Sequence, residues 1–434
     1  MTINFKEFFR ACNPSTTLNI AKPDDKKYYI DFSSVRSGSL IRELKRTITF
    51  SDQATCQLFS GHIGCGKSTE LLRLKAELEE QDYHVVYFES SEELDMGDID
   101  ITDILLVIAR KINDSLQDIK IDINPRYFSK LFGEIKDFLA TEIDLSAGAE
   151  FSMGLAKITA KTKDSPKARK KLRDYLETRS DSIIDSINKE VLEPAIEKLK
   201  EMGKQGLLVI VDNLDRIDNK PKSSGRNQPE YIFFDRGEQL KKLNCHLVYT
   251  IPLTLIFSND ANMLNSRFGV KPKVLSMVPV QSKDGMLNEK GISLLQQMVL
   301  ARAFPDMGEK ERLNMLDKVF ENSEMLDRLC MISGGHVRNL LGFLFSCLQK
   351  EDPPFPENIL DEVIREYRDD LVRKVDADEW ELLHQVVKNQ DVAGENHYHS
   401  LLRSMFVFEY QDKDGAWFGI NPLLAETEKI KSQV

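Results

Sequence analysis

Residues Gly61 to Ser68 read Gly-His-Ile-Gly-Cys-Gly-Lys-Ser, and Thr69 follows. A glycine, four residues and then Gly-Lys-Ser is the spacing of a phosphate-binding loop. Its glycines let successive backbone N–H groups converge on phosphate oxygens. Lys67 would place a positive charge between the β and γ phosphates, and Ser68 would offer its hydroxyl to Mg²⁺. The predicted nucleotide-binding residues are Gly61, His62, Ile63, Gly64, Cys65, Gly66, Lys67, Ser68 and Thr69.

The segments on either side of this loop fit the same chemistry. Residues 56–60 are typical of a short buried strand, and residues 69–79 are typical of an amphipathic helix. Such a helix directs its positive end towards a bound anion. In an empty loop we expect Lys67 to be exposed. Cys65 is either a reactive thiol or only a small residue that the turn accepts.

A second pattern places carboxylates at the end of a buried strand. Residues 206–216 read Gly-Leu-Leu-Val-Ile-Val-Asp-Asn-Leu-Asp-Arg. The apolar run predicts a parallel strand, whose carboxyl end is where open α/β sheets bind ligands. We expect Asp212 to hold Mg²⁺ and Asp215 to polarise the attacking water. Asp215 could instead be a helix cap or a partner of Arg216.

The composition excludes several classes of protein. The chain has 434 residues, 41% of them hydrophobic, which is enough for two or three folded domains. Its formal charge of −11 does not favour a protein that coats nucleic acid. Its six cysteines show no paired spacing and are interpreted as reduced thiols. The sequence shows no signal peptide and no apolar run of about 18 residues. These features predict a cytoplasmic protein without a membrane span.

Patterning along the chain predicts four parts. They are an N-terminal extension at 1–50, a nucleotide-binding core at 51–285, a helical lid at 286–355 and a winged-helix-like domain at 356–434. The core carries an insertion at about 113–204. The fold class predicted is therefore α/β, with a parallel sheet core followed by a helical lid and a winged helix. A short α+β cap would give the same pattern in the last part.

The insertion has three further features. Apolar residues alternate with polar or small ones from 143 to 153, which predicts a small hairpin. Residues 161–173 are the most basic stretch, interpreted as a solvated helix face, with a nucleic-acid or acidic-partner contact as the alternative. A long helix is expected from about 174 to 202. Before the insertion, acidic residues at 92–103 predict a solvated loop that caps the next helix, or a cation site.

These motifs resemble the STAND and AAA+ branches of P-loop ATPases, which include bacterial regulatory and phage-defence ATPases. The resemblance covers roughly residues 51–430 and implies binding of ATP with Mg²⁺. It also implies roles for Thr250 at the end of a core strand, as sensor 1, and for Arg338 at the start of a lid helix, as sensor 2. Arg267 precedes the last core strand, predicted at 274–280, and matches an arginine finger that acts on a neighbouring subunit. In many relatives a glutamate follows the strand aspartate; here Asn213 does, so hydrolysis is expected to be slow.

Three uses of such a site compete. The first is a regulatory switch whose nucleotide state controls self-assembly or a separate effector protein, in bacterial defence or signalling. The second is an initiator-like or transposition-regulator ATPase that acts on DNA through the winged helix. The third is a nucleotide-binding module that barely hydrolyses. Residues 371–434 contain eleven acidic and seven basic residues, which favours the first over the second because a DNA-binding surface should be basic.

Overall fold

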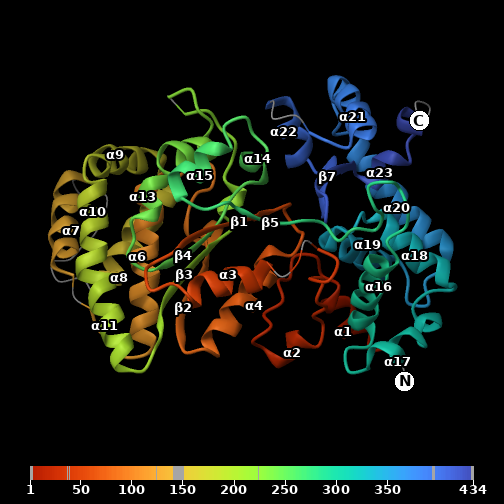
Figure 1. Cartoon of the computed structure of the whole chain (residues 1–434), viewed down its shortest axis with the longest axis horizontal. Helices are drawn as coiled ribbons and strands as arrows, with labels where there is room; N and C mark the ends of the chain where they lie inside the picture. Colours follow the sequence, from red (N-terminus) through yellow and green to blue (C-terminus); the bar gives the residue numbers. More distant parts are fainter. Residues whose placement is uncertain are drawn as a thin grey trace.

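The computed structural model describes residues 3–431 except 37, 39, 124, 140–150, 223 and 393–395. At its centre is a five-stranded sheet in the order β2-β3-β4-β1-β5 (Figure 1). Every strand pairing in it is parallel. The strands are β1 Cys56–Gly61, β2 Tyr83–Glu89, β3 Gly206–Asp212, β4 His246–Thr250 and β5 Lys273–Leu275. The α/β fold class predicted from the sequence is confirmed.

The sheet is covered on both faces, which explains the continuous apolar runs of its strands. Val209 and Val211 of β3 point into a core shared with the helices of the insertion. Leu208 and Ile210, which alternate with them, point into the opposite core. That second core also contains residues of α3 Leu40–Thr49 and α4 Lys67–Glu79.

The last core strand is shorter than the sequence predicted. Residues 274–280 were expected to form it, but β5 ends at Leu275. Beyond β5 the backbone N–H of Met277 donates to the carbonyl of Glu409, 3.0 Å away. Val278 and Val280 pack into the core of the C-terminal helices. After Leu275 the chain therefore leaves the sheet and packs against the C-terminal half.

The insertion is a helical layer, at the left of Figure 1. Its described elements, with the helix that leads into it, are α6 Ile101–Asp118, α7 Arg126–Leu139, α8 Phe151–Asp164, α9 Pro166–Glu177, α10 Ser180–Ser186, η1 Ile187–Leu192 and α11 Glu193–Glu201. Of the predicted hairpin, residues 143–149 lie outside the described residues. Phe151 and Met153 lie in α8, so a strand there is wrong. The predicted long helix at 174–202 is also wrong in part, because the chain breaks between α9 and α10.

The acidic stretch and the basic stretch bind each other. Asp98 accepts from Arg173 at 2.7 Å and from Lys222 at 3.2 Å, and Arg169 lies 2.7 Å from Asp95. Asp100 caps the N-terminus of α6, as expected of this stretch. The four aspartates Asp95, Asp98, Asp100 and Asp103 are thus ion-paired to α9, and its two arginines are engaged within the chain.

Short elements join the strands of the core and the segments before it. They are α1 Phe5–Ala11, α2 Pro23–Lys26, α5 Ser90–Glu93, η2 Leu214–Arg216, α12 Gln228–Glu230, η3 Tyr231–Asp235, α13 Gly237–Lys241, α14 Leu253–Ile256 and α15 Asn262–Phe268. Phe8 and Cys12, in and just after α1, are buried in the core of the C-terminal helices. The start of the chain is therefore anchored to its C-terminal half.

The C-terminal half has a helical body and a smaller unit with a hairpin. The body contains α16 Glu289–Ala303, α17 Glu309–Leu313, η4 Leu316–Lys318, α18 Ser323–Ile332, α19 Val337–Lys350 and α20 Glu357–Val372. After it come α21 Ala377–Asn389, α22 Asn396–Arg403, β6 Val407–Asp412, β7 Gly415–Ile420, α23 Pro422–Ala425 and α24 Glu428–Lys431. Two helices followed by the antiparallel β6–β7 pair form the arrangement expected of a winged helix.

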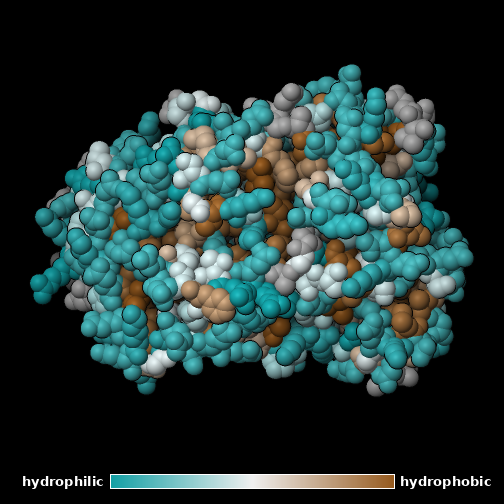
Figure 2. Space-filling model, in the orientation of Figure 1, coloured by the Kyte–Doolittle hydropathy of each residue, from teal (hydrophilic) through white to brown (hydrophobic). Residues whose placement is uncertain are grey.

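Figure 2 shows that this face of the molecule is covered mainly by hydrophilic residues, with hydrophobic ones visible between the sheet and the C-terminal helices. Within the described part of the chain, no helix has both the length and the apolar composition needed to cross a membrane.

Candidate nucleotide-binding site

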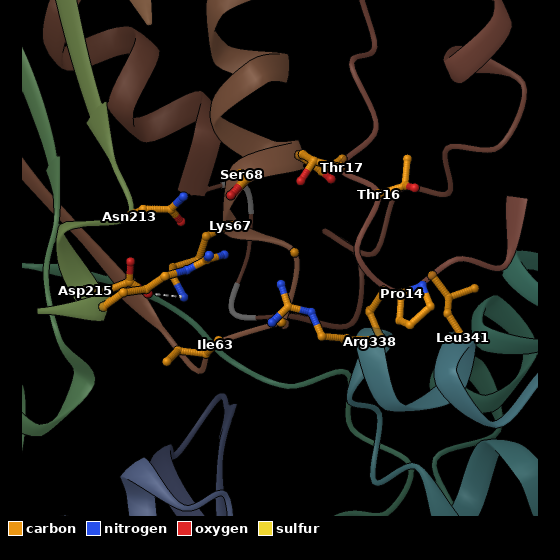
Figure 3. A pocket seen from close by; sticks show the side chains of 15 residues that line it. Pro14, Thr16, Thr17, Ile63, Lys67, Ser68, Asn213, Asp215, Arg338 and Leu341 are labelled. Atoms are coloured by element: carbon orange, nitrogen blue, oxygen red, sulfur yellow. Dashed lines mark ion pairs between the residues drawn. The ribbon is translucent and has the colours of Figure 1, made fainter. Parts of the chain in front are cut away.

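A cavity lies where the loop after β1 meets three other segments (Figure 3). Pro14, Thr16 and Thr17 line it from the N-terminal segment, and Val337, Arg338 and Leu341 line it from α19. The remaining lining comes from the loop itself and from residues after β3, among them Ile63, Gly64, Gly66, Lys67, Ser68, Thr69, Asn213, Asp215 and Arg216. The structure thus brings the predicted loop, Asp215 and Arg338 together.

The loop has the backbone conformation that its glycines allow. Gly64 and Gly66 have φ angles of +87° and +108°, where a side chain would be strained. Gly66 caps α4, a helix of 13 residues whose first N–H groups have no partner within the helix. Those groups and the positive end of the helix dipole suit a phosphate.

Lys67 is buried, so the expectation that it is exposed is wrong. Its side chain is 5% exposed, and its Nζ lies 2.9 Å from Oδ2 of Asp215. It also donates to the carbonyls of Gly61 and His62, both at 2.8 Å. Burial acts to lower the pKa of Lys67, but the charge of Asp215, its hydrogen bond and other nearby groups together outweigh burial, and the pKa is raised. Lys67 is therefore charged and held by acceptors of its own chain.

Asp212 and Ser68 supply the oxygen atoms expected around Mg²⁺. The carboxylate of Asp212 accepts from the hydroxyl of Tyr87 at 2.8 Å and from the N–H of Asn213 at 2.7 Å. Burial raises the pKa of Asp212, as does the nearby charge of Asp215, while a hydrogen bond from Ser68 opposes this. A divalent cation would relieve the cost of that buried carboxylate. The donor set, a hydroxyl and a carboxylate, fits Mg²⁺.

Asp215 and Thr250 have different surroundings. Oδ1 of Asp215 is buried and has no hydrogen-bond partner among the described residues, so it can accept a hydrogen bond from water. Thr250 is fully buried, and its hydroxyl accepts from the N–H of Leu214 at 3.0 Å. It does not line the cavity. Its contact is with the backbone of η2, the turn that carries Asp215.

Two arginines that form no close ion pair bring positive charge to the loop. Arg338 points into the cavity from α19 in Figure 3, and Arg216 lines the same cavity. Neither forms an ion pair within 4.0 Å in the part of the chain that the structure describes. Burial lowers the pKa of Arg338, and the charge of Arg216 lowers it further. An anion between them would remove this repulsion.

Arg267 does not line this cavity. It lies on α15, where its Nε donates to the carbonyl of Phe234 at 3.0 Å. One of its terminal nitrogens pairs with Glu238 at 2.9 Å. Within one chain its guanidinium is therefore engaged away from the loop.

Residues that the sequence analysis missed hold the back of the loop. Arg36, 4% exposed, donates to the carbonyl of Cys65 at 2.9 Å. His336 contacts the carbonyl of Ile63 at 2.8 Å, and the N–H of Glu409 in β6 donates to Nε2 of His62 at 2.8 Å. Cys65 is fully buried there, so its thiol is not accessible. No local sequence pattern predicts these contacts, because the residues that form them are far apart in the chain.

Burial shifts the protonation of the groups behind the loop. It lowers the pKa of His62 to about 3 and that of His336 to about 4. It raises the pKa of Glu409 to about 8, although Arg36 acts in the opposite direction. At neutral pH both imidazoles are therefore neutral, which lets His62 accept the hydrogen bond from Glu409.

Glu89 is a further acid that the sequence analysis did not select. It ends β2, and its Cα is paired in register with that of Asp212. Its carboxylate accepts from the side-chain amide of Asn213. Burial raises the pKa of Glu89, and the charge of Asp212 raises it further. The apolar run that precedes it, which is typical of a buried strand, was the signal that could have found it.

Comparisons with known proteins give no family assignment. No family model matches the chain, and no curated protein matches it. Among solved structures it is similar to the ORC1 protein of Aeropyrum pernix in complex with DNA, at 12% identity and a TM-score of 0.37, covering 91% of this chain and 93% of that chain. It is also similar to the ADP form of the Aeropyrum pernix ORC2 protein, at 12% identity and a TM-score of 0.42, covering 98% and 96%.

A third similar structure is the Walker-type ATPase of Pyrococcus abyssi, at 12% identity and a TM-score of 0.42, covering 96% of this chain and 98% of that chain. With TM-scores this low, these likenesses do not assign a function. The chemistry of this chain has to be inferred from the site itself.

Proposed function

We propose that this chain is an ATPase that binds ATP with Mg²⁺ at the loop after β1 and hydrolyses its γ phosphate. The observation that carries the proposal is the charge around the loop. Arg216 and Arg338 have no ion-pair partner within 4.0 Å among the described residues and line the same cavity as the start of α4. A triphosphate would supply the missing negative charge.

Binding would exchange the partners of Lys67. In the structure its ammonium is held by Asp215 and by two carbonyls of the loop. Phosphate oxygens would take over these contacts, which leaves Asp215 free to hold a water molecule. Ser68 and Asp212 would hold Mg²⁺, which neutralises charge on the phosphates.

Hydrolysis would then proceed by in-line attack of that water. A bond forms between its oxygen and the γ phosphorus, while the bond from this phosphorus to the bridging oxygen breaks. ADP leaves with the electron pair, and the water's proton passes to Asp215 or to a phosphate oxygen. Positioning and charge neutralisation provide the catalysis, without a covalent intermediate.

Single-turnover phosphate release tests the assignment of the acid. Asp215→Asn should retain ATP binding and lose most turnover. Glu89→Gln is the matched control, because it neutralises the other carboxylate near Asp212. Full activity in Asp215→Asn together with loss in Glu89→Gln would move the role to Glu89.

We further propose that this ATPase is a regulatory switch, whose nucleotide state controls self-assembly or a separate effector protein in bacterial defence or signalling. The support is that two C-terminal elements contact the loop: His336, at the start of α19, and Glu409, in the β6–β7 hairpin. A change in the loop on hydrolysis would act on both contacts. Hydrogen exchange of β6–β7 should differ between ADP and a non-hydrolysable ATP analogue. Equal exchange in the two states would contradict the switch.

Action of Arg267 on a neighbouring subunit is part of this proposal. It requires the pair with Glu238 to open in an assembly. Mixing inactive Lys67→Ala and Arg267→Ala chains should then restore hydrolysis, because each lacks a different half of a shared site. Normal activity of Arg267→Ala alone would rule this out.

A further inference from the structure

A second and larger cavity, of about 680 Å³, adjoins the phosphate site. The N-terminal segment forms one side of it, with residues of α1 and α2, and Arg302 of α16 forms part of the other. Thr16 and Leu341 line both cavities, so the two are neighbours. The volume is within the range of pockets that hold small organic ligands.

Arg302 brings a buried and incompletely bonded charge to this cavity. Its side chain lines the cavity although the residue is only 4% exposed. Nε and Nη1 of its guanidinium have no hydrogen-bond partner in the described parts of the chain. The ring of Tyr28 lies 5.2 Å from the guanidinium carbon, which compensates only part of the charge. Buried charges in native proteins are normally paired, so the position of Arg302 requires a physical reason.

None of the three acids that line the cavity, Glu7, Asp24 and Asp25, forms an ion pair with Arg302 within 4.0 Å. Glu7 accepts from Lys27 at 2.7 Å and from Tyr28 at 2.8 Å. Asp25 accepts the backbone N–H of Asn19 at 2.9 Å, and its carboxylate forms no ion pair within 4.0 Å of the guanidinium of Arg302. Glu7 and Asp25 are therefore engaged with other groups of the N-terminal segment.

Arg312 shows how the same fold satisfies a buried arginine that has only a structural role. Its Nε donates to the carbonyl of Phe304 and one terminal nitrogen donates to that of Pro305, both at 3.1 Å. Arg302, on the adjacent helix, has no such acceptors for Nε and Nη1 among the described residues. The difference between the two indicates that Arg302 is arranged for a partner from outside the chain.

We propose that this cavity is a second ligand site, which binds a small organic oxyanion through Arg302 and is separate from the loop that binds ATP. Phosphate and carboxylate groups both match the planar donors of a guanidinium. The tyrosine ring and the mixed lining accommodate the organic part. Because Thr16 and Leu341 belong to both cavities, occupancy of this site acts on nucleotide binding.

Thermal unfolding of the full chain, saturated with ADP and Mg²⁺, tests the proposal with inorganic phosphate and acetate as probes at constant ionic strength. A ligand of the native state raises the melting temperature. We expect a rise with at least one probe, and its loss in Arg302→Met. Arg312→Met is the matched control, which should lower the melting temperature but keep the rise. A rise that persists in Arg302→Met, or no rise with either probe in the unmodified chain, would overturn the proposal.

Two further measurements distinguish binding at Arg302 from a purely structural role of this arginine and from binding at the ATP loop. Without probe, Arg302→Met should be at least as stable as the unmodified chain, because it removes a charge that lacks acceptors; destabilisation like that of Arg312→Met would mean a structural role. If Arg302→Met does not fold, Arg302→Lys keeps the charge and should respond only at higher probe concentration. The rise should survive in the double variant Lys67→Met/Asp215→Asn. Its loss there would assign the binding to the ATP loop.

Discussion

Two charged clusters of this molecule differ in whether the chain neutralises them. In the cluster between the acidic stretch and α9, Asp98 is contacted by Arg169, Arg173 and Lys222. Burial acts to raise the pKa of Asp98, but Arg173 and Lys222 together outweigh it and lower the pKa to about 2. At the loop, Arg216 and Arg338 form no ion pair within 4.0 Å among the described residues. Charges paired within the chain serve the fold, whereas unpaired charges at a cavity indicate a ligand.

The largest effect is expected from Lys67→Ala. It removes a contact with phosphate worth about 1.5–3 kcal/mol and so weakens ATP binding about 10- to 150-fold. Because it also leaves Asp215 buried without its partner, the free energy of unfolding should fall by about 3–5 kcal/mol. Calorimetric titration measures the ATP affinity, and chemical denaturation measures the free energy of unfolding.

The double variant Lys67→Met/Asp215→Asn is the control for that loss. It removes both buried charges, so most of the stability should return while ATP binding stays weak. If Lys67→Ala is as stable as the unmodified chain, the ion pair seen in the structure does not contribute in solution.

Breaking the paired cluster should affect stability alone. Arg173→Ala leaves Asp98 and Asp103 with fewer partners, and we expect the free energy of unfolding to fall by about 2 kcal/mol, since the cluster is only partly buried. ATP affinity should not change. A large loss of ATP affinity in Arg173→Ala would show that the two clusters are not independent.

Removing an arginine of the unpaired cluster should instead weaken ATP binding and leave stability unchanged. Arg338→Ala removes a cation that repels Arg216, so the ligand-free chain should keep its stability. Its affinity for ATP should fall about tenfold, which corresponds to about 1.4 kcal/mol. Chemical denaturation without nucleotide and an ATP titration test both parts; a stability loss without an affinity loss would contradict the comparison.

A further effect concerns the pH dependence of stability and the β6–β7 hairpin. The pKa of Glu409 in the folded chain is raised to about 8 from its ordinary value of 4.5. Between these values the folded state holds a proton that the unfolded state releases, so this contribution to stability is lost as pH rises to about 8. His62 and His336, with pKa values lowered to about 3 and 4, are neutral in the folded state above about pH 6, whereas in the unfolded state they titrate near about 6.5.

Glu409→Gln should therefore flatten the pH dependence of unfolding between about 6.5 and 8, where Glu409 contributes at most about 1.4 kcal/mol per pH unit. The measurement is the free energy of unfolding of both proteins across that range. Parallel curves for the two proteins would show that Glu409 is not protonated behind the loop.

The parts predicted from the sequence were those encoded by neighbouring residues. The loop, the strand that ends in Asp212 and the start of α19 each follow from a continuous pattern. The α8 segment was misread because Phe151, Leu155 and Ile158 also fit a helical period, and the alternation up to Met153 covered too few residues to decide. Lys67 was expected in solvent because its partner Asp215 lies in η2, far from Lys67 in the sequence.

The contacts behind the loop could not be predicted at all. His62 meets Glu409, and Arg36 meets Cys65, only because β6 and the N-terminal segment fold back onto the core. These residues are unremarkable in their own segments. Their meaning depends on tertiary packing, which a single sequence does not specify.

The most direct test of the central claim is a calorimetric titration of the unmodified chain with ATP and Mg²⁺, repeated with Arg173→Ala and Arg338→Ala. We predict saturable binding at one site, unchanged in Arg173→Ala and about tenfold weaker in Arg338→Ala. Absence of saturable binding up to about 1 mM ATP in the unmodified chain, or equal affinity in all three proteins, would contradict the assignment of the unpaired cluster to ATP.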